Sequence, residues 1–178
     1  MYRHNDDPWQ FASSAYELGR YDAIMDALGR RQYRMAFEPG CSIGVLTERL
    51  AMQCDCVVAS DLSPTAVRIA KERCSHLAHV RILCAPVTED LRVDDIDLLV
   101  LSEIGYYFDR EQWRIVAQGL IENVSTSGTI LASHWLGHSD DHLQSGDSVH
   151  EMLLTIDGLA LDQSERHPGF RLDRWRKL

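Results

Sequence analysis

The sequence has few of the features that mark membrane, secreted or disulfide-bonded proteins. Its apolar runs all fall short of the ~20 residues that a membrane-spanning helix requires, so we expect no membrane partner. The opening stretch, MYRHNDDPWQ, has no apolar segment of the kind found in a signal peptide. The 5 cysteines are an odd number without C-x-x-C spacing, so we expect reduced thiols in a cytoplasmic protein.

Positive charge is also scarce. The 178 residues include 18 Lys and Arg against 27 Asp and Glu, a net charge of −9, and no basic cluster is longer than RWRK at 174–177. An acidic chain repels phosphate backbones, so we expect no nucleic-acid partner. With 45% hydrophobic and 25% charged residues the chain has a globular composition, and its length is most simply that of a single domain.

Helical and strand patterns alternate along the chain. Apolar residues at helical spacing predict helices over 14–28, 43–52, 63–73, 109–120 and 149–156. Apolar or alternating runs predict strands over 33–37, 54–60, 80–85, 96–102, 129–133, 159–164 and 170–175. The polar residues 136–147 predict a loop. Such alternation predicts a doubly wound α/β sheet with right-handed crossovers.

Three of these helices begin with capping signals. Ser14 and Glu17 have the spacing of a capping box, and so do Asp109 and Gln112. Ser63 is followed by a proline, which is favoured at the first position of a helix. Ser127-Gly128 predicts a turn into the fifth strand.

The predicted strand ends carry residues that suit a ligand with a ribose. Ligands of doubly wound sheets bind at the carboxyl ends of the strands. The first strand leads into EPGCSIG at 38–44, where Gly40 permits close approach of a ligand and the following helix offers free N–H groups. The second strand ends at Asp61, an acid placed to accept hydrogen bonds from a ribose diol.

A dinucleotide site is the main rival interpretation, but its G-x-G-x-x-G turn must hold a pyrophosphate. Position 38 is a glutamate, which would repel a pyrophosphate and suit an amine. The pattern therefore points to adenosine joined to an amino acid. Purely structural alternatives stay open, since Gly40 and Gly44 could serve only turns and packing, and Asp61 could simply cap the next helix.

With these motifs the sequence resembles the class I, Rossmann-like methyltransferases that use S-adenosylmethionine (SAM). That likeness lies in EPGCSIG at 38–44, DLSPTA at 61–66 and LVLSE at 99–103. A closer resemblance is to the nodulation protein S (NodS) family, carried by NDDPW at 5–9, CSIGVLT at 41–47 and SEIGYY at 102–107.

The resemblance implies a fold and a domain plan. The fold is a mostly parallel seven-stranded sheet with an antiparallel last strand and helices on both faces. The plan is one methyltransferase domain over 1–178, with an N-terminal lid and helix at 1–30. A cofactor-binding core at 31–135 follows, and then a substrate-side loop and closing strands at 136–178.

The resemblance also implies which residues hold SAM and its product S-adenosylhomocysteine (SAH). In it Glu38 lies near the amino group, Asp61 takes the ribose hydroxyls and Leu62 packs on the adenine. Pro86 stands where relatives often have an acid for the adenine amine, so backbone near Val87 is expected to serve instead. The full implied set is Glu38, Gly40, Cys41, Gly44, Asp61, Leu62, Pro86, Val87 and Ser102.

The implied catalytic candidates are Glu103, His134 and Tyr107. An amine acceptor must be neutral and a hydroxyl needs a base, so Glu103 or His134 could accept or steer a proton. The alternatives are that Glu103 is a solvated loop acid and that His134 anchors a loop. Tyr107 is expected in a substrate lid with Trp9 and the 134–147 loop.

Three histidines, at 134, 138 and 142, are four residues apart, which on a helix would align them for a metal ion. The glycines and aspartates between them favour a loop, so we expect no metal.

The predicted function is methyl transfer from SAM to a small-molecule acceptor. The NodS resemblance implies N-methylation of an amino sugar or an oligosaccharide. Three alternatives stay open: an O-methyltransferase of a small metabolite, a NAD-dependent oxidoreductase, and a non-catalytic module that binds SAM or a nucleotide. We expect a cytoplasmic monomer or homodimer.

Overall fold

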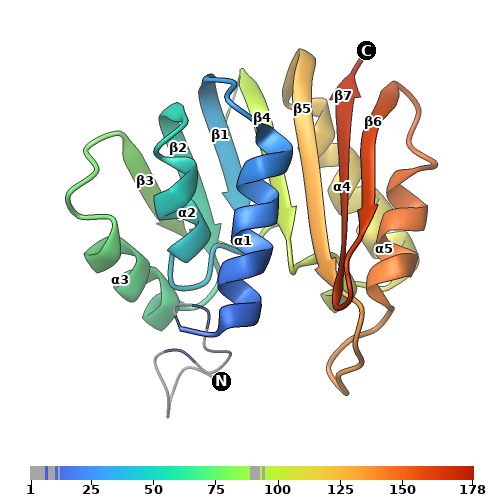
Figure 1. Cartoon of the computed structure of the whole chain (residues 1–178), viewed down its shortest axis with the longest axis horizontal. Helices are drawn as coiled ribbons and strands as arrows, with labels where there is room; N and C mark the ends of the chain where they lie inside the picture. Colours follow the sequence, from blue (N-terminus) through green and yellow to red (C-terminus); the bar gives the residue numbers. More distant parts are fainter. Residues whose placement is uncertain (1–6, 8–10, 12, 89–92, 94) are drawn as a thin grey trace. The chain divides into compact units, whose positions relative to one another are not determined.

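The computed structural model describes residues 7, 11, 13–88, 93 and 95–178 (Figure 1). The chain forms two compact units, Met1–Arg92 and Val93–Leu178. Within the described ranges, every helix is too short or too polar to cross a membrane. The cysteines are all free thiols: Cys41, Cys54 and Cys74 are buried, and Cys84 is exposed.

The first unit alternates helices with parallel strands. Its elements are α1 (Ala15–Leu28), β1 (Tyr33–Pro39), α2 (Val45–Leu50), β2 (Cys54–Asp61), α3 (Pro64–Arg73) and β3 (Val80–Cys84). The strands lie in the order β3-β2-β1 and all run parallel. Because Glu38 pairs with Ala59, and Asp61 pairs with Cys84, the carboxyl ends of these strands meet at one edge.

The second unit adds the antiparallel part. Its strands lie in the order β4-β5-β7-β6, with β5 parallel to β4 and β7 antiparallel to both β5 and β6. Every residue of β4 is buried, as its unbroken apolar run predicts. The elements are β4 (Ile96–Ser102), η1 (Gly105–Tyr107), α4 (Arg110–Glu122), β5 (Val124–Trp135), α5 (Gly146–Leu153), β6 (Leu159–Arg166) and β7 (Phe170–Lys177).

The predicted fold class is confirmed. The described residues form seven strands, most of them parallel, and the last strand, β7, runs antiparallel to its neighbours. Each predicted helix and strand is present, and most bounds agree within three residues. The capping box of Asp109 and Gln112 and the Ser63 cap are also present.

Three local predictions were wrong. The Ser14 side chain makes no capping hydrogen bond in the described structure, and Glu17 pairs with buried Arg20 instead. Strand β5 begins at Val124 because Ser127, at a φ of 64°, forms an irregularity within one long strand and not a turn before it. Helix α5 begins at Gly146, inside the predicted loop.

Gly44 lets α2 and α3 approach closely. It precedes α2 with a φ of 79°, a conformation that costs other residues energy. A Cβ atom at this position would lie 3.0 Å from the Cβ of Ala70 on α3. The neighbouring core includes Cys41, Ala59, Val67, Ala70, Cys74 and Ile82.

We predict that Gly44→Ala lowers the free energy of unfolding by about 2–4 kcal/mol, because it adds crowding to backbone strain. Gly158→Ala is the matched control, since Gly158 has a φ of 80° and a Cβ added there would meet no described atom within 4 Å. The control should lose only about 1 kcal/mol. Urea unfolding measures both, and equal losses would contradict the role of the Ala70 contact.

Candidate functional site

Glu38 is a buried acid at the end of β1. Only 3% of its surface is exposed, and its Oε2 accepts a hydrogen bond of 2.6 Å from Thr47 Oγ1 on α2. Burial raises the pKa of Glu38 to about 8, against the Thr47 hydrogen bond and with a further rise from Asp61. Glu38 is therefore largely neutral at pH 7 in the unliganded protein, and a cation beside it would favour ionisation.

The glycine-rich loop after Glu38 is fixed by its backbone. The N–H groups of Gly40 and Cys41 both donate to Ser60 O, at 2.7 and 2.9 Å, and Gly40 has a φ of 78°. The Cys41 thiol belongs to the core, where burial raises its pKa well above the ordinary value. Any contribution of Cys41 to a ligand would therefore come from its backbone.

Asp61 joins this loop to the start of α3. Its Oδ2 accepts from Ser42 N at 3.0 Å, and its Oδ1 accepts from Ser63 N at 2.8 Å. Burial raises the pKa of Asp61, while these two hydrogen bonds lower it in part. The Asp61 carboxylate therefore holds the start of α3, as the alternative of a purely structural, helix-capping role expects. It also keeps lone pairs that can accept from two hydroxyl groups.

The remaining candidates of the first unit lie beside Asp61. Leu62 is 75% exposed, so its apolar side chain is accessible to a ligand at this edge. Ala85 N donates to Asp61 O at 3.0 Å, which brings the segment after β3 to the same edge. In that segment Pro86 is exposed and Val87 is half-buried. The edge therefore offers backbone groups and apolar surface near Asp61.

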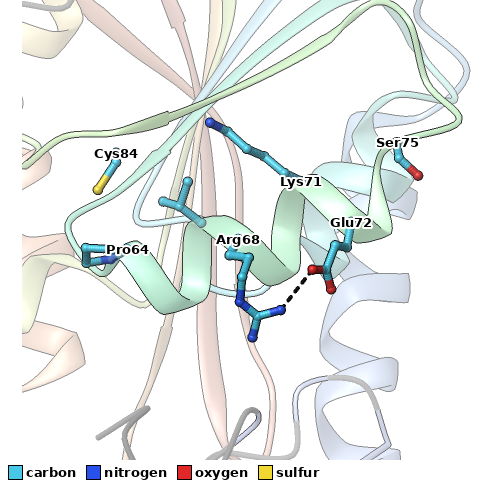
Figure 2. Close-up of a pocket in the computed structure, with 7 residues that line it drawn as sticks. Pro64, Arg68, Lys71, Glu72, Ser75 and Cys84 are labelled. Carbon is cyan, nitrogen blue, oxygen red and sulfur yellow. Dashed lines mark hydrogen bonds and ion pairs between the residues drawn. The ribbon is translucent and has the colours of Figure 1, made fainter.

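A hollow of about 450 Å³ lies along α3, and Pro64 forms part of its lining (Figure 2). An ion pair of 2.9 Å between Arg68 and Glu72 lies beside it, and Cys84 lies across from them. None of the predicted cofactor residues lines it. Its lining is Pro64, Val67, Arg68, Lys71, Glu72, Ser75 and Cys84.

In the second unit, Glu103 follows β4 directly. Its backbone has a φ of 56°, in the left-handed region that few glutamates adopt. Its Oε1 accepts from Trp135 N at 2.7 Å, and its Oε2 accepts from the hydroxyl of Tyr106. Ser102 beside it is buried. Glu103 is thus a half-buried acid fixed by two hydrogen bonds, and not a fully solvated one.

An aromatic cluster lies beside this acid, because Tyr106 donates to Glu103 and also belongs to the cluster. Tyr106 stacks on His142 with ring centroids 3.8 Å apart, and Trp135 lies 6.1 Å from His142. Tyr107 meets His142 edge-on at 5.4 Å and is 41% exposed. Sequence reasoning missed His142 as a member of this cluster. Its only signal, the four-residue spacing from His138, suggested a metal ligand instead.

The 134–147 segment does not form the single helix that a histidine metal site would need. No group of three or more metal-binding side chains occurs among the described residues. His138 is exposed, whereas His134 is fully buried. Trp9, the other predicted lid residue, lies outside the described residues.

His134 uses its ring nitrogens inside the protein. Its Nε2 accepts from Gly105 N at 3.0 Å, and its Nδ1 lies 3.1 Å from His150 Nε2. Together with 0% exposure, this geometry favours the loop-anchoring alternative over direct proton transfer to a substrate.

We predict that Glu38→Gln removes a pH dependence of stability. The unfolded chain loses this proton near pH 4.5 but the folded chain holds it to about pH 8, so the free energy of unfolding falls as pH rises between these values. The glutamine variant should therefore gain a few kcal/mol over the wild type at pH 8.5 relative to pH 4.5, at about 1.4 kcal/mol per pKa unit.

Urea unfolding at both pH values measures this difference. Exposed Glu122→Gln is the control and should follow the wild type at both. Parallel pH profiles for all three proteins would contradict the buried, neutral state of Glu38.

Sequence comparison places the chain among known proteins. The family profile of nodulation protein S (NodS) matches residues 3–139. Nodulation protein S of Sinorhizobium fredii is 28% identical over 128 residues, which cover 71% of this chain and 59% of that protein. The chain therefore spans about three fifths of that relative. Nodulation protein S of Rhizobium tropici is 25% identical, with 96% of this chain and 76% of the relative covered.

Solved structures share the fold. N-methyltransferase NodS from Bradyrhizobium japonicum, in complex with SAH, superposes with a TM-score of 0.86 at 21% identity, over 97% of this chain and 93% of that one. A Pseudomonas syringae protein described as a methyltransferase has a TM-score of 0.76 at 30% identity, over 92% and 100%. The extent of the profile match shows that this chain belongs to the nodulation protein S (NodS) family.

Proposed function

We propose that this chain is a SAM-dependent methyltransferase acting on a small-molecule acceptor. The observation that carries the proposal is the buried acid Glu38 beside a glycine-rich loop that Asp61 holds in place. Family membership supports it, as does the fold shared with an N-methyltransferase solved with SAH. A NAD site is disfavoured, because Glu38 stands where a pyrophosphate would rest.

In this proposal the first unit holds the cofactor. Glu38 ionises beside the ammonium group of SAM, and the backbone at Gly40, Cys41 and Gly44 lines the ligand. Asp61 accepts from the ribose hydroxyls with the lone pairs that its backbone partners leave. The exposed side chain of Leu62 packs on the adenine. The backbone at Pro86 and Val87 borders the edge of the adenine ring.

The second unit supplies the acceptor side. SAM, when bound, provides a methyl group on a sulfonium, so the protein's main task is to align the nucleophile. Ser102 closes the methionine side. Glu103 accepts or steers the proton of the nucleophile, and Tyr107 presents an exposed ring to the acceptor. His134 supports the neighbouring turn, because its Nε2 already accepts a hydrogen bond from the backbone N–H of Gly105.

We further propose that the acceptor is an amine, as in an amino sugar or an oligosaccharide that carries one. Glu103 suits a cationic group before deprotonation, and the rings of Tyr107 and Trp135 suit the flat face of a sugar. The chain would act in the cytoplasm, as a monomer or homodimer, as one domain with a lid at 1–30, a core at 31–135 and a substrate side at 136–178.

We predict proton release when SAM binds. At pH 7 Glu38 is mostly neutral, and the ammonium group lowers its pKa, so binding should release close to one proton; release should vanish above pH 9. Calorimetry in phosphate and in Tris measures this as a buffer-dependent heat. Glu38→Gln should bind more weakly and show no buffer dependence. A buffer-independent heat for the wild type would place the ammonium group elsewhere.

We predict transfer of labelled methyl from SAM to amino sugars but not to their N-acetylated counterparts, which lack a nucleophilic amine. Scintillation counting over a panel of free and acetylated sugars tests this. Transfer to hydroxyl-only sugars would instead identify an O-methyltransferase. SAM binding without transfer to any acceptor in a broad metabolite panel would favour a non-catalytic module.

In the same assay, Glu103→Gln should lower kcat by about 10²-fold or more while SAM affinity stays within about twofold, because the lost group acts on the acceptor's proton. Tyr106→Phe is the control, since it removes the hydroxyl on Glu103 Oε2 but keeps the charge. The control should lose far less activity. Weaker SAM binding with unchanged kcat in Glu103→Gln would assign Glu103 to the cofactor.

A further inference from the structure

A line of hydrogen bonds crosses the buried interior of the second unit. It begins at Gly105 N, which donates to His134 Nε2 at 3.0 Å, and Ile104 N lies 3.4 Å from the same nitrogen. His134 Nδ1 lies 3.1 Å from His150 Nε2 on α5, and His150 Nδ1 lies 2.7 Å from Asp173 Oδ2 on β7. His134, His150 and Asp173 each have 0% exposure.

The order of donors along this line follows from its first member. A backbone N–H can only donate, so His134 Nε2 carries no hydrogen and its hydrogen sits on Nδ1. His134 Nδ1 then donates to His150 Nε2, and the hydrogen of His150 must sit on its own Nδ1. That nitrogen donates to the carboxylate of Asp173. Both imidazoles are therefore neutral, with every hydrogen directed toward Asp173.

Charged groups hold the far end of the line. Arg171 Nε donates to Asp173 Oδ2 at 2.9 Å, and Arg171 also lies 3.7 Å from Asp147 on α5. Burial raises the pKa of Asp173, but hydrogen bonds, including that from His150, lower it overall. Burial lowers the pKa of His150 despite the nearby Asp173 carboxylate. Both directions agree with an ionised aspartate and a neutral histidine.

At its other end, at His134, this series of hydrogen bonds holds η1, the turn that follows the proposed proton acceptor Glu103. Gly105 begins η1, directly after Glu103 and Ile104, and a Cβ there would lie 2.4 Å from Val149 Cγ1 on α5. Tyr106, which donates to Glu103, packs edge-on against the His134 ring at 5.4 Å. The position of His134 therefore sets the position of η1, and with it the partner of Glu103.

We propose that His134, His150 and Asp173 are positioning residues that hold the η1 turn and the Tyr106 ring, and through them Glu103, in the orientation needed for methyl transfer. The effect of this positioning on methyl transfer rests on the proposed function. The sequence of donors and acceptors from Gly105 to Asp173 does not. Adding a proton to His134 would turn Nε2 into a donor facing Gly105 N–H.

The groups that face the two imidazoles complete the electrostatic picture. They are Tyr106 from the turn, Asp147 from α5, and Arg171 and Asp173 from β7. Arg171 pairs with both aspartates, and Arg166 also pairs with Asp147, so the two carboxylates face two guanidinium groups. Burial outweighs the attraction of Asp173 and Asp147 for a proton on His150, and a proton on His134 Nε2 would cost the hydrogen bond to the turn.

The tautomers give a test that is independent of any activity. Long-range ¹H–¹⁵N spectra of the wild type at pH 7.5 should show both His134 and His150 with hydrogen on Nδ1, the less common tautomer of a free histidine. A hydrogen on Nε2 of His134 would overturn the proposal. This measurement requires no known methyl acceptor.

Two variants at one position test the positioning role. A glutamine amide has an acceptor and a donor that can replace the two nitrogens of His150, whereas a leucine fills the space without either. The amide hydrogen of Gly105 should exchange at least about 10-fold faster in His150→Leu and near the wild-type rate in His150→Gln. The amide of Val100, on fully buried β4, should stay protected in both and reports that the variants fold.

With a competent acceptor, His150→Leu should lower kcat at least about 10-fold with little change in SAM affinity, and His150→Gln should restore most of it. Equal Gly105 exchange in the two variants, with Val100 protected, would overturn the positioning role even if methyl transfer is confirmed.

Discussion

The carboxylate of Asp61 is the contact on which the proposed cofactor site depends. It accepts one backbone N–H from the glycine-rich loop, at Ser42, and another from the start of α3, at Ser63. Without it, both N–H groups would lose this hydrogen bond in a partly buried place, at a cost of about 1 kcal/mol each. The loop that would face SAM thus takes its position from the end of the neighbouring strand.

The second unit repeats this construction with other residues. Glu103 accepts from Trp135 N and from the Tyr106 hydroxyl, and His134 accepts from Gly105 N. In each case a polar side chain at a strand end holds the turn beside it. Residues proposed to bind ligands are therefore also structural, so binding, turnover and stability must be measured separately for each variant.

The fold was predictable because its signals are local. The apolar run of β4 and the capping box of Asp109 and Gln112 each lie within one turn or strand, and both are present. The failures come from signals with two meanings. Ser127-Gly128 suits a turn as well as an irregularity in a strand, and Ser14 has the spacing of a capping box while Glu17 pairs with Arg20. Tertiary context decides between these outcomes.

The site was predictable only in part, for the same reason. Glu38, Gly40 and Asp61 lie at strand ends, so their spacing was enough to bring them to one edge. The pKa of Glu38 depends on burial, which no spacing reveals. The link from His134 to Asp173 depends on β7 pairing antiparallel with β5, which sets Ala132 opposite Asp173. A slip of one residue would turn Asp173 to the other face, so this link exists only through the register of the folded sheet.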